Sequence, residues 1–317
     1  MIETGAVTFQ VSIVICTDNR VRSLEKTLRS LRQLDYKNFE VCVVYGPTPD
    51  GTRALLESCG YSLKTKGCAE RNLSKSRNLG IALASGDIVA FLDDDAIPEP
   101  EWLGQIVEAY NDPAVGAAGG FVQDHTGAAY QYKFGTTDRL GRAQLDWDRP
   151  APEYNFPFSA NFPHMLGANS SFRRQALIDV GGFDEEYEYF LDETDVQCRI
   201  IDGGWLIAQL DGAHVHHKFM PSSIRNERRV QSSWYTVVKN KIYYCLVNGL
   251  KYHTISEVMA EGRKFIDKLH FDMEDAIGVG TLESGARDVF AKEIEQAWED
   301  GLRQGLSGHR QLLTLPN

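Results

Sequence analysis

The stretch IVAFLDDD, residues 88–95, decides the fold, because five apolar residues run directly into three aspartates. A short unbroken apolar run is typical of a strand that is buried on both faces of a parallel sheet. Ligands of such sheets bind beyond the carboxyl ends of the strands. We therefore expect Asp93, Asp94 and Asp95 to lie at a ligand-binding edge of an α/β sheet.

The sequence on both sides of this stretch alternates between strand and helix patterns. Further strands are predicted over 11–16, 39–45, 116–122 and 205–210, and helices from Ser23 and over 71–85, 99–110, 173–180 and 192–202. This alternation predicts a mostly parallel sheet with helices on both faces.

Two regions depart from this alternation. Residues 124–165 are rich in aromatic residues and proline, and are interpreted as loops or a small insert over the site. Three helical patterns follow at 227–248, 255–269 and 284–303. We therefore divide the chain into a sheet domain over 8–224 and a helical C-terminal extension over 225–317.

Bulk properties restrict the function classes. The 317 residues carry a net charge of −11, which argues against a nucleic-acid partner. No run approaches the about 20 apolar residues that cross a bilayer. The first ten residues lack the basic start of a secretory signal, and the six cysteines form no C-x-x-C pair. A cytoplasmic protein with reduced thiols is the simplest expectation.

Three adjacent carboxylates repel one another unless a cation or hydrogen bonds compensate them. Asp93 and Asp95 are two residues apart and point to the same side if the chain is still extended. Carboxylates that also face phosphates suit Mg²⁺ or Mn²⁺. A solvated acidic turn is the alternative at this point, whereas an EF-hand is excluded because its glycine and distant glutamate are missing.

Five segments occur in the order of the motifs of the family 2 glycosyltransferases and resemble them. They are CTDNR (16–20), RNLSKSRNLGIALASGDIVAFLDDD (71–95), GANSSFRR (167–174), GGFDE (181–185) and FLDETD (190–195). Each motif is weak alone, but five in order are specific. The resemblance covers about residues 10–225. It implies the GT-A fold and an inverting, metal-dependent transfer of sugar from a nucleotide-sugar donor.

The resemblance assigns donor contacts to residues at two strand ends. Asp95 would bind the cation together with Asp93, while Asp93 or Asp94 would reach the ribose and nucleotide. Thr17 and Asp18 would lie beside the nucleoside. Arg77 matches an arginine near the base and diphosphate, with a surface arginine of a helix as the alternative.

The resemblance also supplies a base and a third metal ligand. Glu193 aligns with the residue that deprotonates the acceptor, and Asp192 remains the alternative. His217 would be a metal ligand or diphosphate contact, with His216 as second choice. Asn169 and Arg173 belong to the acceptor side in this family.

The nucleobase is left open by a departure from the motif pattern. Relatives often carry an acidic residue after the second strand, where this chain reads Tyr45-Gly46-Pro47-Thr48. UDP is the default donor nucleotide, with GDP and dTDP as alternatives. Trp147 in the variable middle segment could stack on an acceptor sugar or pack in the core.

The sequence thus predicts an inverting glycosyltransferase with Mn²⁺ or Mg²⁺, acting on a glycan, glycolipid or other hydroxyl acceptor. A catalytically inactive nucleotide-sugar binding module is the alternative. A haloacid-dehalogenase-type phosphotransferase lacks its second motif here, and a processive synthase lacks Q-x-x-R-W. Peripheral contact with the inner membrane face and a homo-oligomer through the C-terminal helices both remain open.

Overall fold

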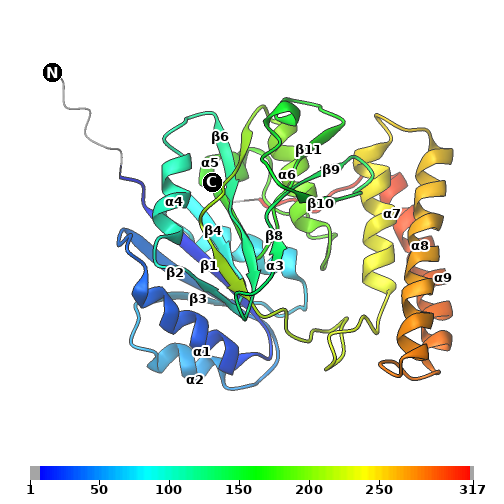
Figure 1. Ribbon diagram of the computed structural model, residues 1–317, viewed down its shortest axis with the longest axis horizontal. Coiled ribbons are helices and arrows are strands. Elements are labelled where there is room, and N and C mark those ends of the chain that lie inside the picture. Colours follow the sequence, from blue (N-terminus) through cyan, green and yellow to red (C-terminus); the bar gives the residue numbers. More distant parts are fainter. Residues whose placement is uncertain (1–7, 315–317) are drawn as a thin grey trace.

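The computed structural model describes residues 8–314, so the expectation about the first ten residues falls mostly outside it. Its centre is a seven-stranded sheet in the order β13-β6-β12-β4-β1-β2-β3 (Figure 1). Its strands are β1 (Val11–Thr17), β2 (Phe39–Tyr45), β3 (Leu63–Gly67), β4 (Ile88–Leu92), β6 (Val115–Gly119), β12 (Asn169–Arg173) and β13 (Leu206–Gln209). The expected mostly parallel sheet is confirmed.

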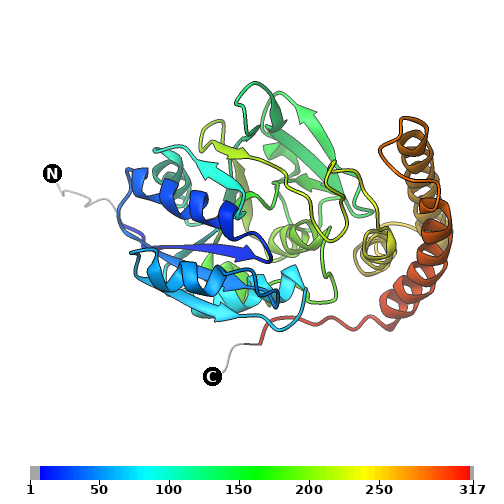
Figure 2. The same cartoon turned by 90° about the horizontal axis from the view of Figure 1, so that it is seen from below.

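Helices cover both faces of this sheet, and each face has its own apolar core (Figures 1 and 2). Leu28, Leu56 and Ile106 bring α1 (Val21–Ser30), α2 (Thr52–Ser58) and α4 (Trp102–Ala109) onto one face. Ile81, Leu177 and Ile200 bring α3 (Leu73–Leu83), α5 (Arg174–Asp179) and α6 (Asp192–Asp202) onto the other. A single 3₁₀ turn, η1 (Leu31–Gln33), extends α1.

Strand β12 was not anticipated, and it runs antiparallel to both β4 and β6. Its sequence reads NSSFR, which lacks the apolar signature of a buried strand. The side chains of Asn169, Ser170 and Ser171 are nevertheless buried, and those of Asn169 and Ser171 form hydrogen bonds inside the sheet domain. Ser171 Oγ, for example, donates to the carbonyl of Ala118 at 2.7 Å. Strand β3 and helix α2 were also missing from the prediction.

The middle segment, expected as loops or a small insert, contains short strands. One small sheet has the order β10-β9-β11 and another β5-β14-β7-β8. Their strands are β5 (Ala96–Pro98), β7 (Val122–Asp124), β8 (Tyr130–Tyr132), β9 (Phe134–Asp138), β10 (Gln144–Trp147), β11 (Asn161–Pro163) and β14 (Val215–His217), with a 3₁₀ turn η2 (Pro152–Tyr154). The second sheet is the one that matters for the site, because it brings residues 215–217 beside the end of β4.

The C-terminal part consists of α7 (Tyr235–Gly249), α8 (Ile255–Gly278) and α9 (Ala286–Ser307), which pack on one another at one end of the sheet domain (Figure 1). The helix expected from residue 227 begins only at Tyr235. The residue that caps its first turn is far away in the sequence. Glu293 of α9 accepts from the backbone N–H groups of Trp234 and Tyr235. After α9 the chain runs back along the sheet domain (Figure 2).

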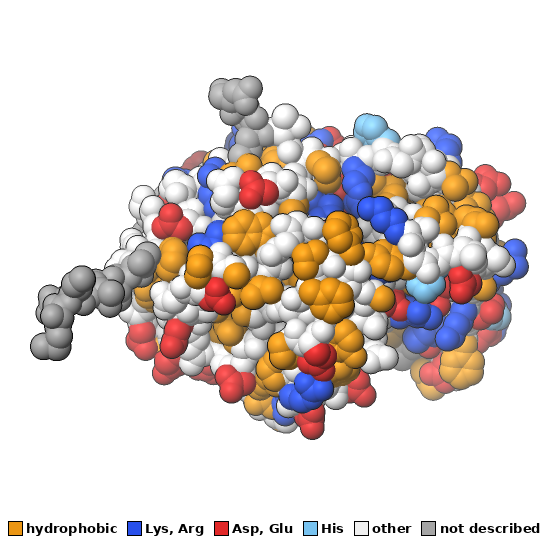
Figure 3. Space-filling model, turned by 90° about the horizontal axis from the view of Figure 1, so that it is seen from above, with side chains coloured by type: hydrophobic (Ala, Val, Ile, Leu, Met, Phe, Trp, Pro, Cys, Tyr) orange, Lys and Arg blue, Asp and Glu red, His pale blue; other side chains and the backbone are white. Residues whose placement is uncertain are grey.

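On the face seen in Figure 3, acidic and basic side chains are interspersed among apolar ones. Within residues 8–314, none of the helices combines the length and apolar character that crossing a bilayer demands.

Candidate active site

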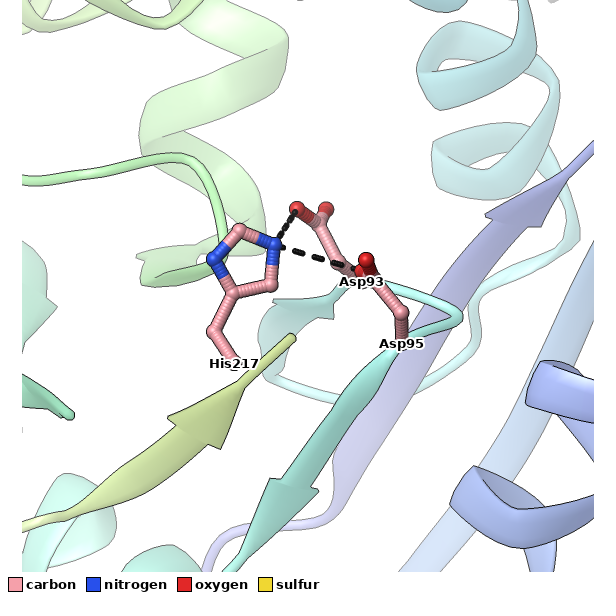
Figure 4. A group of neighbouring side chains, drawn as sticks. All are labelled: Asp93, Asp95 and His217. Carbon is pink, nitrogen blue, oxygen red and sulfur yellow. Dashed lines mark ion pairs between the residues drawn. The ribbon is translucent and has the colours of Figure 1, made fainter. Parts of the chain in front are cut away.

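A carboxylate and histidine cluster lies at the carboxyl end of β4 (Figure 4). Asp93, Asp95 and His217 each present one ligand atom, and these three atoms lie within 4.8 Å of one another. His217 Nε2 is 3.2 Å from Asp95 Oδ1 and 3.5 Å from Asp93 Oδ2. The Asp93 side chain is 38% exposed, whereas Asp95 is buried beneath it. One member of the cluster is therefore open to a ligand.

His217 reaches this cluster through strand pairing. Strand β14 pairs with β5 so that His217 lies opposite Ala96, next to Asp95 in the chain. The Oε1 of Gln131 contacts His217 Nδ1 at 2.8 Å, which fixes the ring with Nε2 toward the carboxylates. His216 points elsewhere and pairs with Glu99. Of the two histidines considered, the structure brings only His217 to the aspartates.

The three residues fit a divalent cation. Asp95 Oδ1 is buried without a hydrogen-bond partner, while Oδ2 accepts from the N–H of Met220 at 2.7 Å. Burial alone would raise the pKa of Asp95, but His217 and that N–H lower it to about 2. Burial likewise opposes a charged His217, yet Asp95 and Asp93 raise its pKa. A buried carboxylate oxygen that faces an oriented imidazole is a donor set that Mn²⁺ or Mg²⁺ accepts.

Two residues expected at the nucleoside have structural bonds instead. Asp94 is 3% exposed, and its oxygens accept from Thr17 Oγ1 at 2.6 Å and Arg20 Nη1 at 3.0 Å. The side chains of Thr17 and Asp94 are thus occupied by each other and by Arg20. Their expected contact with the donor stays a prediction, and the bonds that they make fix the turn that carries Asp93 and Asp95.

Asp18 lies at the end of the adjacent strand and retains access to solvent. Its carboxylate accepts from the N–H of Thr48 at 3.1 Å and from Arg71 Nε at 3.0 Å. Gly46 permits this approach, since a Cβ at that position would stand 2.7 Å from the Asp18 side chain. Asp18 and Arg71 therefore form a polar edge beside the cluster, in the region where the sequence predicted the nucleoside.

Arg77 is a buried partner of the second carboxylate group. Its Nη1 bonds to Asp192 Oδ2, and the two side chains are 6% and 1% exposed. The guanidinium also stacks 5.1 Å from the ring of Phe183. Gly167 leaves room for it, because a Cβ there would lie 2.6 Å from Arg77 Nη2. The alternative of a surface arginine is therefore wrong.

Arg77 links the two carboxylate groups electrostatically. Burial would lower its pKa, but the charges of Asp192, Glu193 and Asp93 outweigh burial and raise it. Glu193 is only partly buried at the start of α6. Burial, followed by repulsion from Asp192, raises the pKa of Glu193 to about 8. A carboxyl group that titrates near neutral pH can serve as a proton acceptor.

The two residues expected on the acceptor side lie at opposite ends of β12. Asn169 is fully buried and its amide donates to the carbonyls of Phe121 and Ala213. Arg173 lies opposite Ile88, at the other end of β4 from the aspartates, and donates to the carbonyl of Val115. Both side chains are used in packing β12, and their expected role toward an acceptor stays a prediction.

Trp147 occupies an edge strand, β10, with its ring 6.0 Å from that of Tyr154 and under the guanidinium of Arg149. Within residues 8–314 it makes no hydrogen bond to the metal or base residues. Its expected role toward an acceptor sugar stays a prediction.

Sequence reasoning missed two residues of the site. Arg20 was in the quoted CTDNR motif, and its bonds to Asp94 and to the carbonyl of Pro221 make it the bridge between the β4 turn and the chain after β14. Gln131 had no sequence signal, because it reaches His217 only through the pairing of β8, β7 and β14.

Comparisons with known proteins agree with this geometry. The sequence model of glycosyl transferase family 2 matches residues 12–181. The glucosyl-dolichyl phosphate glucuronosyltransferase of Haloferax volcanii is 31% identical over 182 residues, covering 55% of this chain and 56% of that protein. The chondroitin synthase of Pasteurella multocida is 26% identical over 268 residues, or 74% of this chain and 27% of that one. The chain spans about half or less of the length of these relatives.

Solved structures share the fold. The mannosyltransferase PcManGT from Pyrobaculum calidifontis, in complex with GDP-Man and Mn²⁺, superposes with a TM-score of 0.58 at 16% identity, covering 95% of this chain and 87% of that one. TarS from S. aureus in complex with UDP-GlcNAc gives 0.56 at 15% identity, covering 94% and 81%. The GT-A fold expected from the sequence is thereby confirmed.

Proposed function

This chain belongs to glycosyl transferase family 2, and from that premise we propose that it transfers a sugar from a nucleotide-sugar donor to an acceptor hydroxyl with inversion at the anomeric carbon. The observation that carries the proposal is the cluster of Asp93, Asp95 and His217 at the carboxyl end of β4. Arg77 bonds to Asp192 of the second carboxylate pair, and the charges of Asp192, Glu193 and Asp93 raise its pKa.

The first carboxylate group suits the leaving side of the reaction. Asp93, Asp95 and His217 would hold a divalent ion, which when bound stabilises negative charge on the departing nucleoside diphosphate. Asp94 would help to position Asp93 and Asp95, because its bonds to Thr17 and Arg20 fix the turn that carries all three aspartates. Asp18 lies at the neighbouring strand end, where the nucleoside of the donor would lie.

The second carboxylate group suits the attacking side. Glu193 would take the proton of the acceptor hydroxyl as its oxygen bonds to the anomeric carbon, while the bond to the diphosphate breaks on the opposite face. Asp192 is held by Arg77 and stays in place as Glu193 gains and loses its proton. Asp192 remains the second candidate for the base, because its position is one residue away on the same helix turn.

We propose the donor and the acceptor from the ligands and names of the similar proteins. UDP is our first choice of nucleotide, and GDP the second, since TarS and PcManGT were solved with UDP-GlcNAc and GDP-Man respectively. The names of the relatives refer to a dolichyl phosphate glycolipid and to chondroitin. We propose a glycolipid or cell-surface glycan acceptor, met by a cytoplasmic enzyme at the inner face of the membrane.

The first test is calorimetric titration of UDP, GDP and dTDP, each with Mn²⁺ and with EDTA. We expect one nucleotide to bind in a metal-dependent way, and Asp95→Asn to remove that dependence. His216→Ala is the matched control, because His216 pairs with Glu99 and not with the aspartates. A folded protein that binds none of the three nucleotides would contradict the proposal.

A second test separates an enzyme from a nucleotide-sugar binding module. Release of nucleoside diphosphate from the matching nucleotide sugar is followed for the wild type and for Glu193→Gln. Turnover that falls by orders of magnitude in the variant, with nucleotide affinity unchanged, supports the assigned base. Binding without turnover over a panel of sugars and acceptors would favour the inactive module.

A further inference from the structure

Helix α7 packs against the sheet domain with polar groups rather than with an apolar face alone. Seven of its buried side chains bond to the sheet domain, and each donates to a backbone carbonyl or a carboxylate there: Lys239, Asn240, Lys241, Tyr243, Tyr244, Cys245 and Asn248. Buried donors of this kind fix one geometry, because each loses its bond if the partner moves. The C-terminal helices are therefore tied to particular segments of the sheet domain.

Asn240 is bonded to the turn that leads into the base helix. It is fully buried, and its Nδ2 donates to the carbonyls of Tyr189 and Phe190. Phe190 and Leu191 have φ angles of +73° and +65°, which are unfavourable for residues with a Cβ. Such a conformation persists only where its surroundings enforce it. Asn240 supplies that enforcement directly before Asp192, the first residue of α6.

A second contact comes from the chain after α9. Arg310 Nη1 bonds to Asp195 Oδ1 at 2.8 Å and to Asp184 Oδ2 at 3.2 Å, and both carboxylates are fully buried. Its Nη2 donates to Asn248 Oδ1 of α7 at 2.8 Å. Arg310 therefore joins the first turn of α6, the segment before it and helix α7 in one network.

The backbone around Arg310 holds it against the same segment (Figure 2). The N–H of Leu313 donates to Gly181 O at 2.7 Å, and the N–H of Glu185 donates to Gln311 O at 2.9 Å. We call residues 309–314 the strap. It crosses the GGFDE motif, which lies between β12 and α6 in the chain.

We propose that Asn240 and Arg310 are positioning residues for Asp192 and Glu193, so that the C-terminal helices and the strap form part of the base side of the active site. This inference rests on the proposed function, because it needs α6 to carry the base. Neither residue bonds to Asp93, Asp95 or His217 within residues 8–314. Loss of either residue should therefore disturb the placement of the base without breaking a bond of the donor-side cluster.

The test compares Asn240→Ala with Lys241→Met. Lys241 is the next residue on α7 and equally buried, but it donates to the carbonyls of Leu140 and Gly141 instead. Nucleoside diphosphate affinity with Mn²⁺, its release from the nucleotide sugar, and Tm are measured for each. We expect Asn240→Ala to lower kcat about 10- to 100-fold with nucleotide affinity unchanged, as for a base displaced by about 1 Å. Lys241→Met should lower Tm without a matching loss of kcat.

The strap is tested in the full chain with Arg310→Lys and Arg310→Gln, and with Arg303→Gln as control. Arg303 pairs with Asp300 on the exposed side of α9. We expect Arg310→Gln to lose kcat, Arg310→Lys to restore part of it, and Arg303→Gln to match the wild type. Loss of kcat in proportion to Tm across all five variants would make the role merely structural and overturn the inference. A kcat of Asn240→Ala equal to that of the wild type would also overturn the inference. If the wild-type protein itself neither bound a nucleotide nor turned over a nucleotide sugar, the proposed function would be wrong instead.

Discussion

Replacement of Arg77 by methionine should show how much the buried ion pair of Arg77 with Asp192 contributes to the stability of the protein. Arg77 and Asp192 are 6% and 1% exposed, so water does not compensate either charge when the other is removed. Methionine keeps an apolar side chain at this position, but it removes the guanidinium that lies over Phe183 and leaves the Asp192 carboxylate unpaired. Breaking a buried pair on one side costs about 3–5 kcal/mol. We expect a loss of that size in the free energy of unfolding.

The measurement is urea unfolding followed by circular dichroism, with two comparison variants. Arg29→Met removes an exposed ion pair with Glu25 and should cost less than about 1 kcal/mol. The double variant Arg77→Met with Asp192→Asn removes both charges, and should recover much of the loss because no unpaired carboxylate remains. A loss below about 1 kcal/mol in Arg77→Met, or none recovered in the double variant, would refute the claim that these charges neutralise each other.

Three further predictions concern the same site. Turnover should rise with pH around a midpoint of about 8, because Glu193, whose pKa is raised by burial and by its acidic neighbour, accepts a proton only once it is ionised; a flat profile between pH 6 and 9 would remove it as the base. EDTA should weaken nucleotide binding by the wild type and by His216→Ala alike, and should leave the already weak binding of Asp95→Asn unchanged in calorimetry. Gly167→Ala should destabilise the protein by about 1–3 kcal/mol in urea unfolding, because its Cβ would meet the guanidinium of Arg77 at 2.6 Å; unchanged stability would mean that this guanidinium can move aside.

The sequence predicted the parts of the fold that follow from apolar periodicity. Strand β4 and helix α6 have the bounds expected for them, since each has a clear pattern and a clear end. Strand β12 was missed, because its polar residues are buried through long-range bonds that no local pattern reveals. The start of α7 was misplaced for a similar reason, as its cap, Glu293, is 58 residues further along the chain than Tyr235.

For the candidate site, the sequence identified the two groups of carboxylates, but it did not reveal which partners each side chain has in the folded protein. The choice between His216 and His217 depended on the register of β14 against β5, which is a tertiary property. The roles expected for Asn169 and Arg173 stay predictions, because a resemblance in motif transfers the position of a residue and not the direction of its side chain. In the structure both side chains donate to backbone carbonyls of neighbouring segments.

The arrangement of the three consecutive aspartates was predicted from the sequence only in part. The sequence predicted that Asp93 and Asp95 share a side if the chain remains extended, and they do converge on His217. The chain is not extended at these residues, however. It turns here, and the N–H of Ala96 donates to Asp93 O. What separates the three residues is the set of partners around the turn: Arg20 and Thr17 take up Asp94, while one oxygen of Asp95 is left without a donor. The side chains that surround the turn, and not the alternation of an extended strand, therefore bring Asp93 and Asp95 together beside His217.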